Sequence, residues 1–169
     1  VEDQLTNEMF TDDMALYVEM MEDNYHTSPI VGLAWGNNKK IYTTNNLAVF
    51  ESQPFIDWLM DETRKKNVYD AKRTYVALNR YVGKMTGIAF DVLLAAYLLD
   101  TNDNNADIEG VAQHYGYDAI QSDEAIYGKG AKKGLPEDEE VFFGHLARKI
   151  KAIQFLTSKL DSELTEKNQ

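Results

Sequence analysis

Few side chains in this sequence have the type and spacing that hydrolytic or metal-dependent chemistry requires. Glu19 is the one charged residue in the apolar run from Met14 to Met21, MALYVEMM. This run is a strand candidate, apolar enough to lie centrally in a sheet. Glu19 is either a solvent-facing acid or a sheltered carboxylate, and its apolar neighbours make the second interpretation as plausible as the first.

The remaining candidates for metal or nucleophile chemistry have weaker patterns. Asp70 and Asp91 each stand at the start of a predicted helix, which favours a role as N-cap over a role as ligand. The histidines at positions 26, 114 and 145 do not form a motif such as H-x-x-x-H. The sequence has no cysteine and no G-x-S-x-G motif, which excludes disulfides, thiolate metal sites and that type of nucleophile.

The charge balance argues against a nucleic-acid-binding surface. The net charge is −11, from 28 acidic and 17 basic residues, and such a surface repels phosphates unless its basic residues cluster. Two groups of basic residues do occur close together in sequence. We interpret the first as a solvated face and the second as part of a loop, in preference to a nucleic-acid patch. The groups are Arg64, Lys65, Lys66, Lys72 and Arg73, and Lys129, Lys132 and Lys133.

The polar, Gly-rich stretch 121–136 is interpreted as a mobile loop. A phosphate-binding loop is the nearest alternative, but G-x-x-x-x-G-K-[ST] is absent and no strand precedes the glycines. The stretch is therefore not expected to bind phosphate.

Length and composition predict one globular domain over residues 1–169. The chain has 169 residues, of which 44% are hydrophobic and 27% charged. Its longest apolar run, 92–99, is far shorter than the roughly 20 residues of a membrane helix, and no signal-peptide pattern opens the chain. The absence of cysteine fits a cytoplasmic location. Because the chain begins with Val1, we expect it to be part of a larger protein.

The elements that must position these side chains follow from the hydrophobic patterning. Three strands with short turns predict an antiparallel meander, and later strand–helix units predict a layered, mixed α/β sheet flanked by helices. Strands are predicted at 14–21, 30–35, 40–44, 67–69 and 87–90, and helices at 54–63, 71–82, 92–99, 107–115 and from about 136 to the C-terminus. Residues 101–106 are predicted to be a loop.

Residues 87–100, GIAFDVLLAAYLLD, predict the central unit of this fold. Gly87 to Phe90 is expected to be a buried strand, and Asp91 to cap the helix that follows. Every residue from Val92 to Leu99 is apolar or Tyr, so the helix is expected to be largely covered by the rest of the domain.

Both the order of the elements and several local motifs resemble the ribonuclease H-like 3′–5′ exonuclease domains of bacterial DNA polymerase I. The similar segments are GIAFDVLLAAYLLD, VYDAKR, EAIYGKGAKK and HLARKIKAI, and the similarity covers essentially the whole chain. The sequence looks most like the Gram-positive, Bacillus-type branch, whose large fragment carries this domain before the polymerase domain. The resemblance implies a ribonuclease H-like fold.

Active members of that family hold two divalent metal ions with four carboxylates, which matches the need of hard cations for oxygen ligands. Carried over by resemblance, Tyr17 stands where the first Asp is expected, and Glu19 keeps the second acid. At the second motif, Thr74 replaces the metal-binding Asp, and Asp70 lies four residues before it. On the last helix, the expected Tyr and final Asp are replaced by His145 and Lys149.

The resemblance therefore implies a degenerate site with no catalytic residue, no metal and no cofactor. Lys149 would repel a metal ion and pair with Glu19, while Tyr17 and Thr74 would fill the vacated pocket. The expected function is a vestigial, non-catalytic module beside the DNA-directed DNA polymerase domain of its parent chain, in replication and repair without proofreading. Alternatives are a non-cleaving single-stranded DNA-binding module and an active metal-dependent 3′–5′ exonuclease. DNA is expected to bind through the parent enzyme, and no membrane is expected as a partner.

Overall fold

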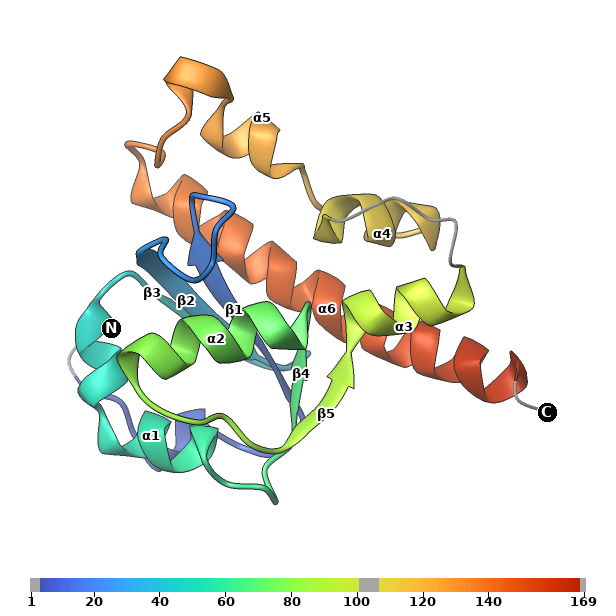
Figure 1. The fold of residues 1–169 in the computed structure, drawn as a ribbon, viewed down its shortest axis with the longest axis horizontal. Helices are drawn as coiled ribbons and strands as arrows, with labels where there is room; N and C mark the ends of the chain where they lie inside the picture. Colours follow the sequence, from blue (N-terminus) through green and yellow to red (C-terminus); the bar gives the residue numbers. More distant parts are fainter. Residues whose placement is uncertain (1–3, 101–106, 168–169) are drawn as a thin grey trace.

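A mixed sheet of five strands, in the order β3-β2-β1-β4-β5, forms the centre of the computed structural model, which describes residues 4–100 and 107–167 (Figure 1). β1 (Met14–Met20), β2 (Ile30–Gly36) and β3 (Ile41–Thr44) form the predicted antiparallel meander. β4 (Lys66–Val68) and β5 (Ile88–Asp91) add to it in parallel. The predictions of a mixed sheet and of a central first strand are confirmed.

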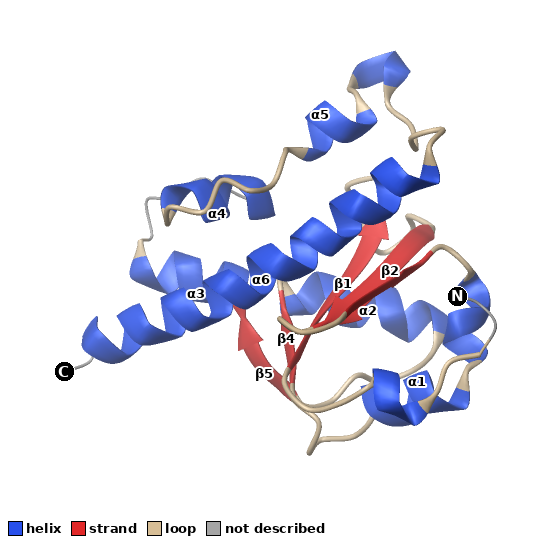
Figure 2. Cartoon of the chain, turned by 180° about the vertical axis from the view of Figure 1, so that it is seen from behind, coloured by secondary structure: helices blue, strands red, loops and turns tan. Residues whose placement is uncertain are grey.

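Helices cover both faces of this sheet (Figures 1 and 2). On one face lie α1 (Gln53–Leu59) and α2 (Ala71–Tyr81), and on the other the long α6 (Glu139–Lys167). Alongside α6 lie α3 (Val92–Leu99), α4 (Ile108–His114) and α5 (Asp123–Tyr127). Short 3-10 turns are η1 (Asn7–Met9), η2 (Leu47–Glu51) and η3 (Gly130–Lys132). The predicted loop at 101–106 lies outside the described residues.

β1 is buried along its whole length and supplies both halves of the core. Because side chains alternate across a strand, Leu16 and Val18 pack on the face of α1 and α2. Ala15 and Tyr17 pack on the face of α6. The same alternation places Glu19 on the α6 face, directly along the strand from Tyr17.

The helix predicted at 54–63 ends earlier, at Leu59. Asp61 explains the early end, because its carboxylate accepts hydrogen bonds from the Thr63 backbone N–H at 2.9 Å and from the Thr63 hydroxyl at 2.7 Å. An aspartate that bonds to the backbone two residues later stabilises a turn in competition with the helix. The chain then turns into β4.

The expectation that residues 87–99 are buried is wrong in part. β5 is the edge strand of the sheet, and Ile88 is 37% exposed. α3 packs on α6 through one side only, so that Leu94, Tyr97 and Leu98 are exposed. The predicted N-cap is confirmed, since the Asp91 carboxylate accepts a hydrogen bond from the Leu93 backbone N–H at 3.1 Å.

The stretch 121–136 is not simply a loop, because it contains α5 and the turn η3. Ser122 caps α5 by accepting a hydrogen bond from the Ala125 backbone N–H at 3.1 Å. Tyr127 at the end of α5 is buried against the core. This anchor holds α5 over the start of α6, where it joins the site described next.

Candidate functional site: a buried ion-pair cluster between β1 and α6

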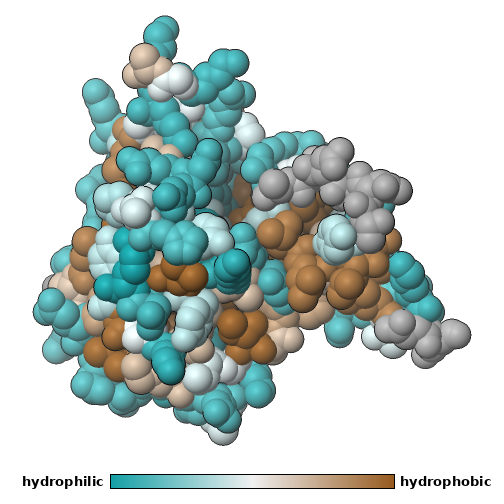
Figure 3. All heavy atoms as spheres, in the orientation of Figure 1, coloured by the Kyte–Doolittle hydropathy of each residue, from teal (hydrophilic) through white to brown (hydrophobic). Residues whose placement is uncertain are grey.

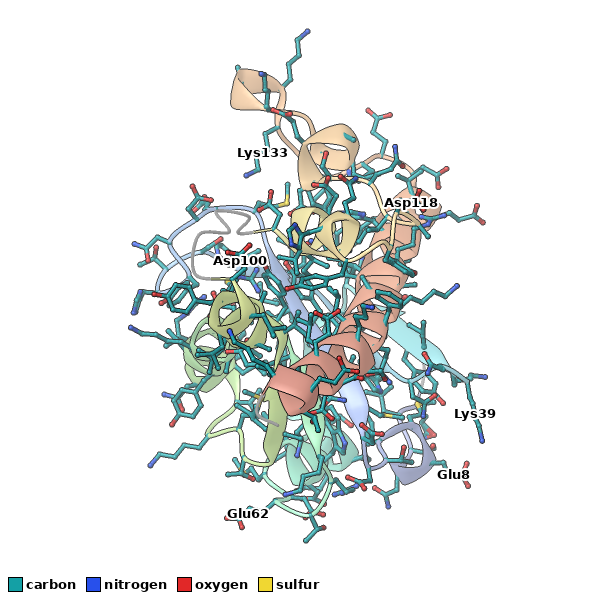
Figure 4. All side chains as sticks on the ribbon, turned by 90° about the vertical axis from the view of Figure 1, so that its right-hand side faces the viewer. Glu8, Lys39, Glu62, Asp100, Asp118 and Lys133 are labelled. Atoms are coloured by element: carbon teal, nitrogen blue, oxygen red, sulfur yellow. The ribbon has the colours of Figure 1, made fainter. Side chains whose placement is uncertain are left out.

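β1 and α6 together position the side chains of this cluster. Tyr17 and Glu19 project from the same face of β1, and His145 and Lys149 lie one helical turn apart on α6. All four are buried. They differ in this from charged residues such as Glu8, Lys39, Glu62 and Asp118, which extend outward at the surface (Figure 4).

Lys149 lies at the centre of the cluster. Its Nζ donates to Glu19 Oε2 at 2.6 Å and to the Tyr17 hydroxyl at 3.2 Å. The ammonium also lies 4.4 Å from the centroid of the Tyr17 ring, within the range of a cation–π contact. The pairing of Lys149 with Glu19 that the resemblance implies is thus present.

Glu19 is a sheltered carboxylate, which decides between the two interpretations of this residue. Its side chain is 1% exposed, and each oxygen has partners. Oε2 accepts from Lys149 and, at 2.8 Å, from the Tyr127 hydroxyl. Oε1 accepts from the Tyr17 hydroxyl and from the Met20 backbone N–H, each at 3.3 Å. A buried charge with a full set of partners avoids most of the cost of burial.

Asp123 of α5 completes the cluster from the solvent side. Its Oδ1 lies 2.8 Å from Lys149 Nζ and 2.7 Å from His145 Nε2. The Asp123 side chain is half-exposed, whereas His145 is fully covered. The lysine ammonium therefore bridges one deeply buried carboxylate and one at the surface.

The pKa shifts follow from this arrangement. Burial opposes the charged form of Lys149, but the carboxylate of Glu19, then Tyr17 and Asp123, outweigh it and raise the Lys149 pKa well above its usual value. Burial likewise opposes ionisation of Asp123, but the hydrogen bond from His145 and the charge of Lys149 prevail and lower the Asp123 pKa. Burial, followed by the neighbouring Glu19, raises the pKa of Tyr127. These directions keep Asp123 and Lys149 charged and Tyr17 and Tyr127 neutral at neutral pH.

Asp70 and Thr74 belong to the first turn of α2. Asp70 caps this helix by accepting from the Arg73 backbone N–H at 3.1 Å, as expected. The buried Thr74 hydroxyl donates to the Asp70 carbonyl at 2.9 Å. Asp91 accepts from the backbone N–H groups of Asp70 and Ala71, each at 2.9 Å, and so stabilises the starts of two helices.

Beside the cluster is a cleft of about 190 Å³ whose charged lining residues are mainly acidic. The charged lining residues are Glu19, Glu22, Asp23, Asp70, Asp107, Glu109 and Asp123, against Arg73, Lys133 and Lys149. Of the three cationic residues, Lys149 is already paired with two carboxylates. The cleft therefore presents negative charge to an approaching ligand.

The metal ions that the fold family implies do not fit these residues. Among the described residues, the ligand atoms of Glu19, Asp123 and His145 lie within 4.8 Å of one another, close enough for one ion. The Lys149 ammonium, however, contacts both carboxylates of that set. A metal ion would have to displace it, and a pair of dications needs several more carboxylates than this position offers.

Asp123 and Tyr127 were missed because the sequence predicted a loop at 121–136. The run Ser122-Asp123-Glu124, an N-cap followed by acidic residues, could have indicated a short helix there.

The basic group from Arg64 to Arg73 forms the predicted solvated face only in part, since Lys65 and Lys72 are exposed but the others are drawn toward the protein. Lys66 is fully buried, and its Nζ donates to the carbonyls of Asp61 at 2.9 Å and Arg64 at 2.7 Å. The Arg73 guanidinium lies 5.1 Å from the centroid of the Tyr17 ring. Lys66 and Arg73 are used internally because their alkyl stems and charges complete the packing around β4 and β1.

Within the described part of the chain, no helix combines the length and the apolar character that crossing a membrane requires.

Comparison with known proteins identifies relatives along the whole chain. Residues 16–156 match the family described as "DNA polymerase I, ribonuclease H-like domain". DNA polymerase I of Geobacillus stearothermophilus is 43% identical over 169 residues, which is 100% of this chain and 19% of the relative. DNA polymerase I of Bacillus subtilis (strain 168) is 39% identical over 98% of this chain and 19% of its own length. The chain thus spans about a fifth of these relatives.

Solved structures show the same fold at low sequence identity. NrnC of Brucella melitensis superimposes with a TM-score of 0.76 at 13% identity, over 95% of this chain and 78% of that chain. A structure described as the POL domain of Pol1 from M. smegmatis, in complex with DNA primer-template and dNTP, gives a TM-score of 0.67 at 18% identity. It matches 94% of this chain and 25% of that one. The predicted ribonuclease H-like fold is confirmed.

Proposed function

Because the chain belongs to the family of ribonuclease H-like domains of DNA polymerase I, we propose that it is a non-catalytic 3′–5′ exonuclease-like module of such a polymerase. In this proposal, residues 1–169 form one domain that acts as a structural neighbour of the polymerase domain. The parent enzyme extends DNA in replication and repair without proofreading from this site.

The contact between Lys149 and Glu19 carries the proposal. A two-metal exonuclease needs a pocket lined by carboxylates that face the ions. Here the remaining acid on β1 is paired with an ammonium 2.6 Å away and accepts a hydrogen bond from the Tyr127 hydroxyl at 2.8 Å. Removing that ammonium from Glu19 to admit a metal would leave a buried lysine without its main partner, which is costly.

Tyr17 and Thr74 support the same conclusion. At the positions where the resemblance implies aspartates, Tyr17 stacks under the Lys149 ammonium and Thr74 hydrogen-bonds to its own helix. Neither side chain supplies the negative charge that would hold a dication.

A nuclease assay tests the proposal. The purified chain is incubated with 5′-labelled single-stranded DNA and Mg²⁺ or Mn²⁺, and we expect no shortening beyond that in a chelated control. Glu19→Gln is the diagnostic variant and Glu22→Gln, at the rim of the same cleft, its matched control. Shortening that disappears only in Glu19→Gln would refute the proposal, whereas shortening that persists in both variants indicates a contaminating nuclease.

The alternative of a non-cleaving single-stranded DNA-binding module is disfavoured by the acidic lining of the cleft. Such modules combine a positive groove with aromatic side chains for base stacking. Binding measured by fluorescence anisotropy at increasing salt separates the two functions. The affinity of a binding module for single-stranded DNA decreases steeply as salt is added. For this chain we expect no measurable binding to single-stranded DNA, even at low salt.

A further inference from the structure

Among the described residues, four exposed large apolar side chains belong to α3 and to the strand that leads into it. Leu94, Tyr97 and Leu98 are 54%, 55% and 51% exposed, and Ile88 of β5 is 37% exposed. Figure 3 shows this patch as a group of brown atoms on the same side of the molecule as α3. We call Ile88, Leu94, Tyr97 and Leu98 the α3 patch.

The helical repeat explains why the three α3 residues of the patch lie together. Leu94, Tyr97 and Leu98 have the spacing i, i+3 and i+4, which places them on one face of a helix. Val92, Ala95 and Ala96 form the opposite, buried face against α6. α3 thus has two apolar faces and no charged residue from Val92 to Leu99. A surface helix that packs on one side only ordinarily has a polar outer face, and contiguous apolar patches on a surface indicate an interaction site.

We propose that the α3 patch is the surface through which this module packs against the remainder of its DNA polymerase I chain. This inference rests on the proposed function, in which the module is a neighbour of the polymerase domain. The matched relatives are about five times longer than this chain, which spans 19% of their length. A large part of the parent protein is therefore available to cover the patch.

The position of α6 supports this occupant. The last turns of α6 run beside α3, and Lys167 Nζ donates to the Leu98 carbonyl at 3.3 Å (Figures 1 and 2). A polymerase domain joined on the C-terminal side of α6 would enter the parent structure next to the patch. A short connection would then suffice to bring an apolar surface of that domain onto Leu94 and Leu98. A short connection also favours this contact, because it raises the effective concentration of the two surfaces.

The chemistry of the patch argues against nucleic acid as its partner. It offers no cation for phosphates, whereas nucleic-acid affinity depends mainly on such contacts. Its apolar side chains instead match the core of a protein interface, where charged residues are depleted.

The double variant Leu94→Glu/Leu98→Glu tests the inference in both the isolated chain and the full-length parent polymerase. Leu47→Glu/Leu135→Glu is the matched control, since these leucines are also exposed, at 42% and 48%, but lie elsewhere. We expect the α3 variant to leave the melting temperature of the isolated chain unchanged. In the parent it should expose α3 to hydrogen exchange and accelerate proteolytic separation of the module by about tenfold or more, because burying one leucine contributes at least about that factor to an equilibrium.

Three results would overturn the inference. The α3 variant could leave the parent as protected as the control does, or it could destabilise the isolated chain equally, which would make the patch part of the module's own fold. Sedimentation could instead show that the isolated chain dimerises and that only the α3 variant is monomeric, which would assign the patch to a second copy. The nuclease assay is independent of all three, so a failure of the docking inference and a failure of the proposed function are distinguishable.

Discussion

Lys66 and Lys149 are both buried in this protein, yet their ammonium groups are stabilised by opposite kinds of partner. The Lys149 Nζ contacts the carboxylates of Glu19 and Asp123. The Lys66 Nζ contacts two backbone carbonyls and lies 5.1 Å from the centroid of the Trp58 ring. One lysine is held by charges and the other by dipoles.

The difference appears directly in the two pKa values. Carboxylates outweigh the effect of burial at Lys149 and raise its pKa. Burial prevails at Lys66 and lowers its pKa to about 8. Because carbonyl dipoles do not compensate a full charge, Lys66 is tolerated at a cost, whereas Lys149 is required by the carboxylate beside it. The comparison indicates that Lys149 and Glu19 must change together, while Lys66 can change alone.

The largest expected effect is that of Lys149→Met. This variant leaves the Glu19 carboxylate buried without its counter-ion, which destabilises proteins by about 3–5 kcal/mol. Urea unfolding followed by circular dichroism measures the change. Lys151→Met, at an exposed position on the same helix, is the control and should be close to neutral. A loss below about 1 kcal/mol for Lys149→Met would contradict a strongly coupled pair.

A double-mutant cycle sharpens this prediction. Glu19→Gln removes the buried charge, so adding it to Lys149→Met should recover part of the lost stability, with a coupling energy of up to about 3 kcal/mol. The same Glu19→Gln change in the native background should be destabilising, because it leaves the Lys149 ammonium without its closest partner. Additive effects of the two substitutions would show that the ion pair contributes little.

Lys66→Met should lower the free energy of unfolding by less, about 1 kcal/mol, because removal of a buried charge partly offsets the lost hydrogen bonds. Its pH dependence is more specific. Between pH 8 and the usual lysine pKa of about 10.4, the unfolded chain keeps a proton that folded Lys66 has lost, so stability contributed by this group rises with pH.

Lys149 has the opposite dependence, because a raised pKa gives stability that is present below the unfolded pKa and lost only above it.

The lowered pKa of Lys66 is tested by measuring the unfolding free energy of wild type and of Lys66→Met at pH 7 and at pH 9.5. The wild type should become more stable relative to the variant at the higher pH. An unchanged difference would mean that Lys66 titrates as an ordinary exposed lysine, against its full burial.

The two lysines also show how much the sequence could predict. The strand meander, the caps at Asp70 and Asp91 and the pairing of Lys149 with Glu19 depend on local patterns or on a family resemblance, and all were predicted. The burial of Lys66 was not, because three residues of β4 give no alternation to reveal which side chains point inward.

The outer face of α3 and the role of α5 escaped prediction for a related reason. An all-apolar helix is expected to be buried, but the sequence does not state whether its cover comes from the same domain. α5 is only five residues long, too short for a periodic pattern, and its contribution depends on a contact with α6 some 22 residues later. Tertiary contacts of this kind are not encoded in local spacing.

Asp123→Asn tests that contact and should have the smallest effect of the series. Its carboxylate is half-exposed, so solvent and salt screen its attraction to Lys149 and His145 far more than they screen Glu19. Because its pKa is lowered in the folded state, the stability it contributes is present above the unfolded pKa of about 3.9 and is lost as the pH falls through the folded value. The variant should therefore differ from wild type at pH 7 and converge with it in strong acid, and the difference at pH 7 should shrink in high salt. A loss as large as that of Lys149→Met would mean that the surface carboxylate, and not Glu19, is the main partner of the buried lysine.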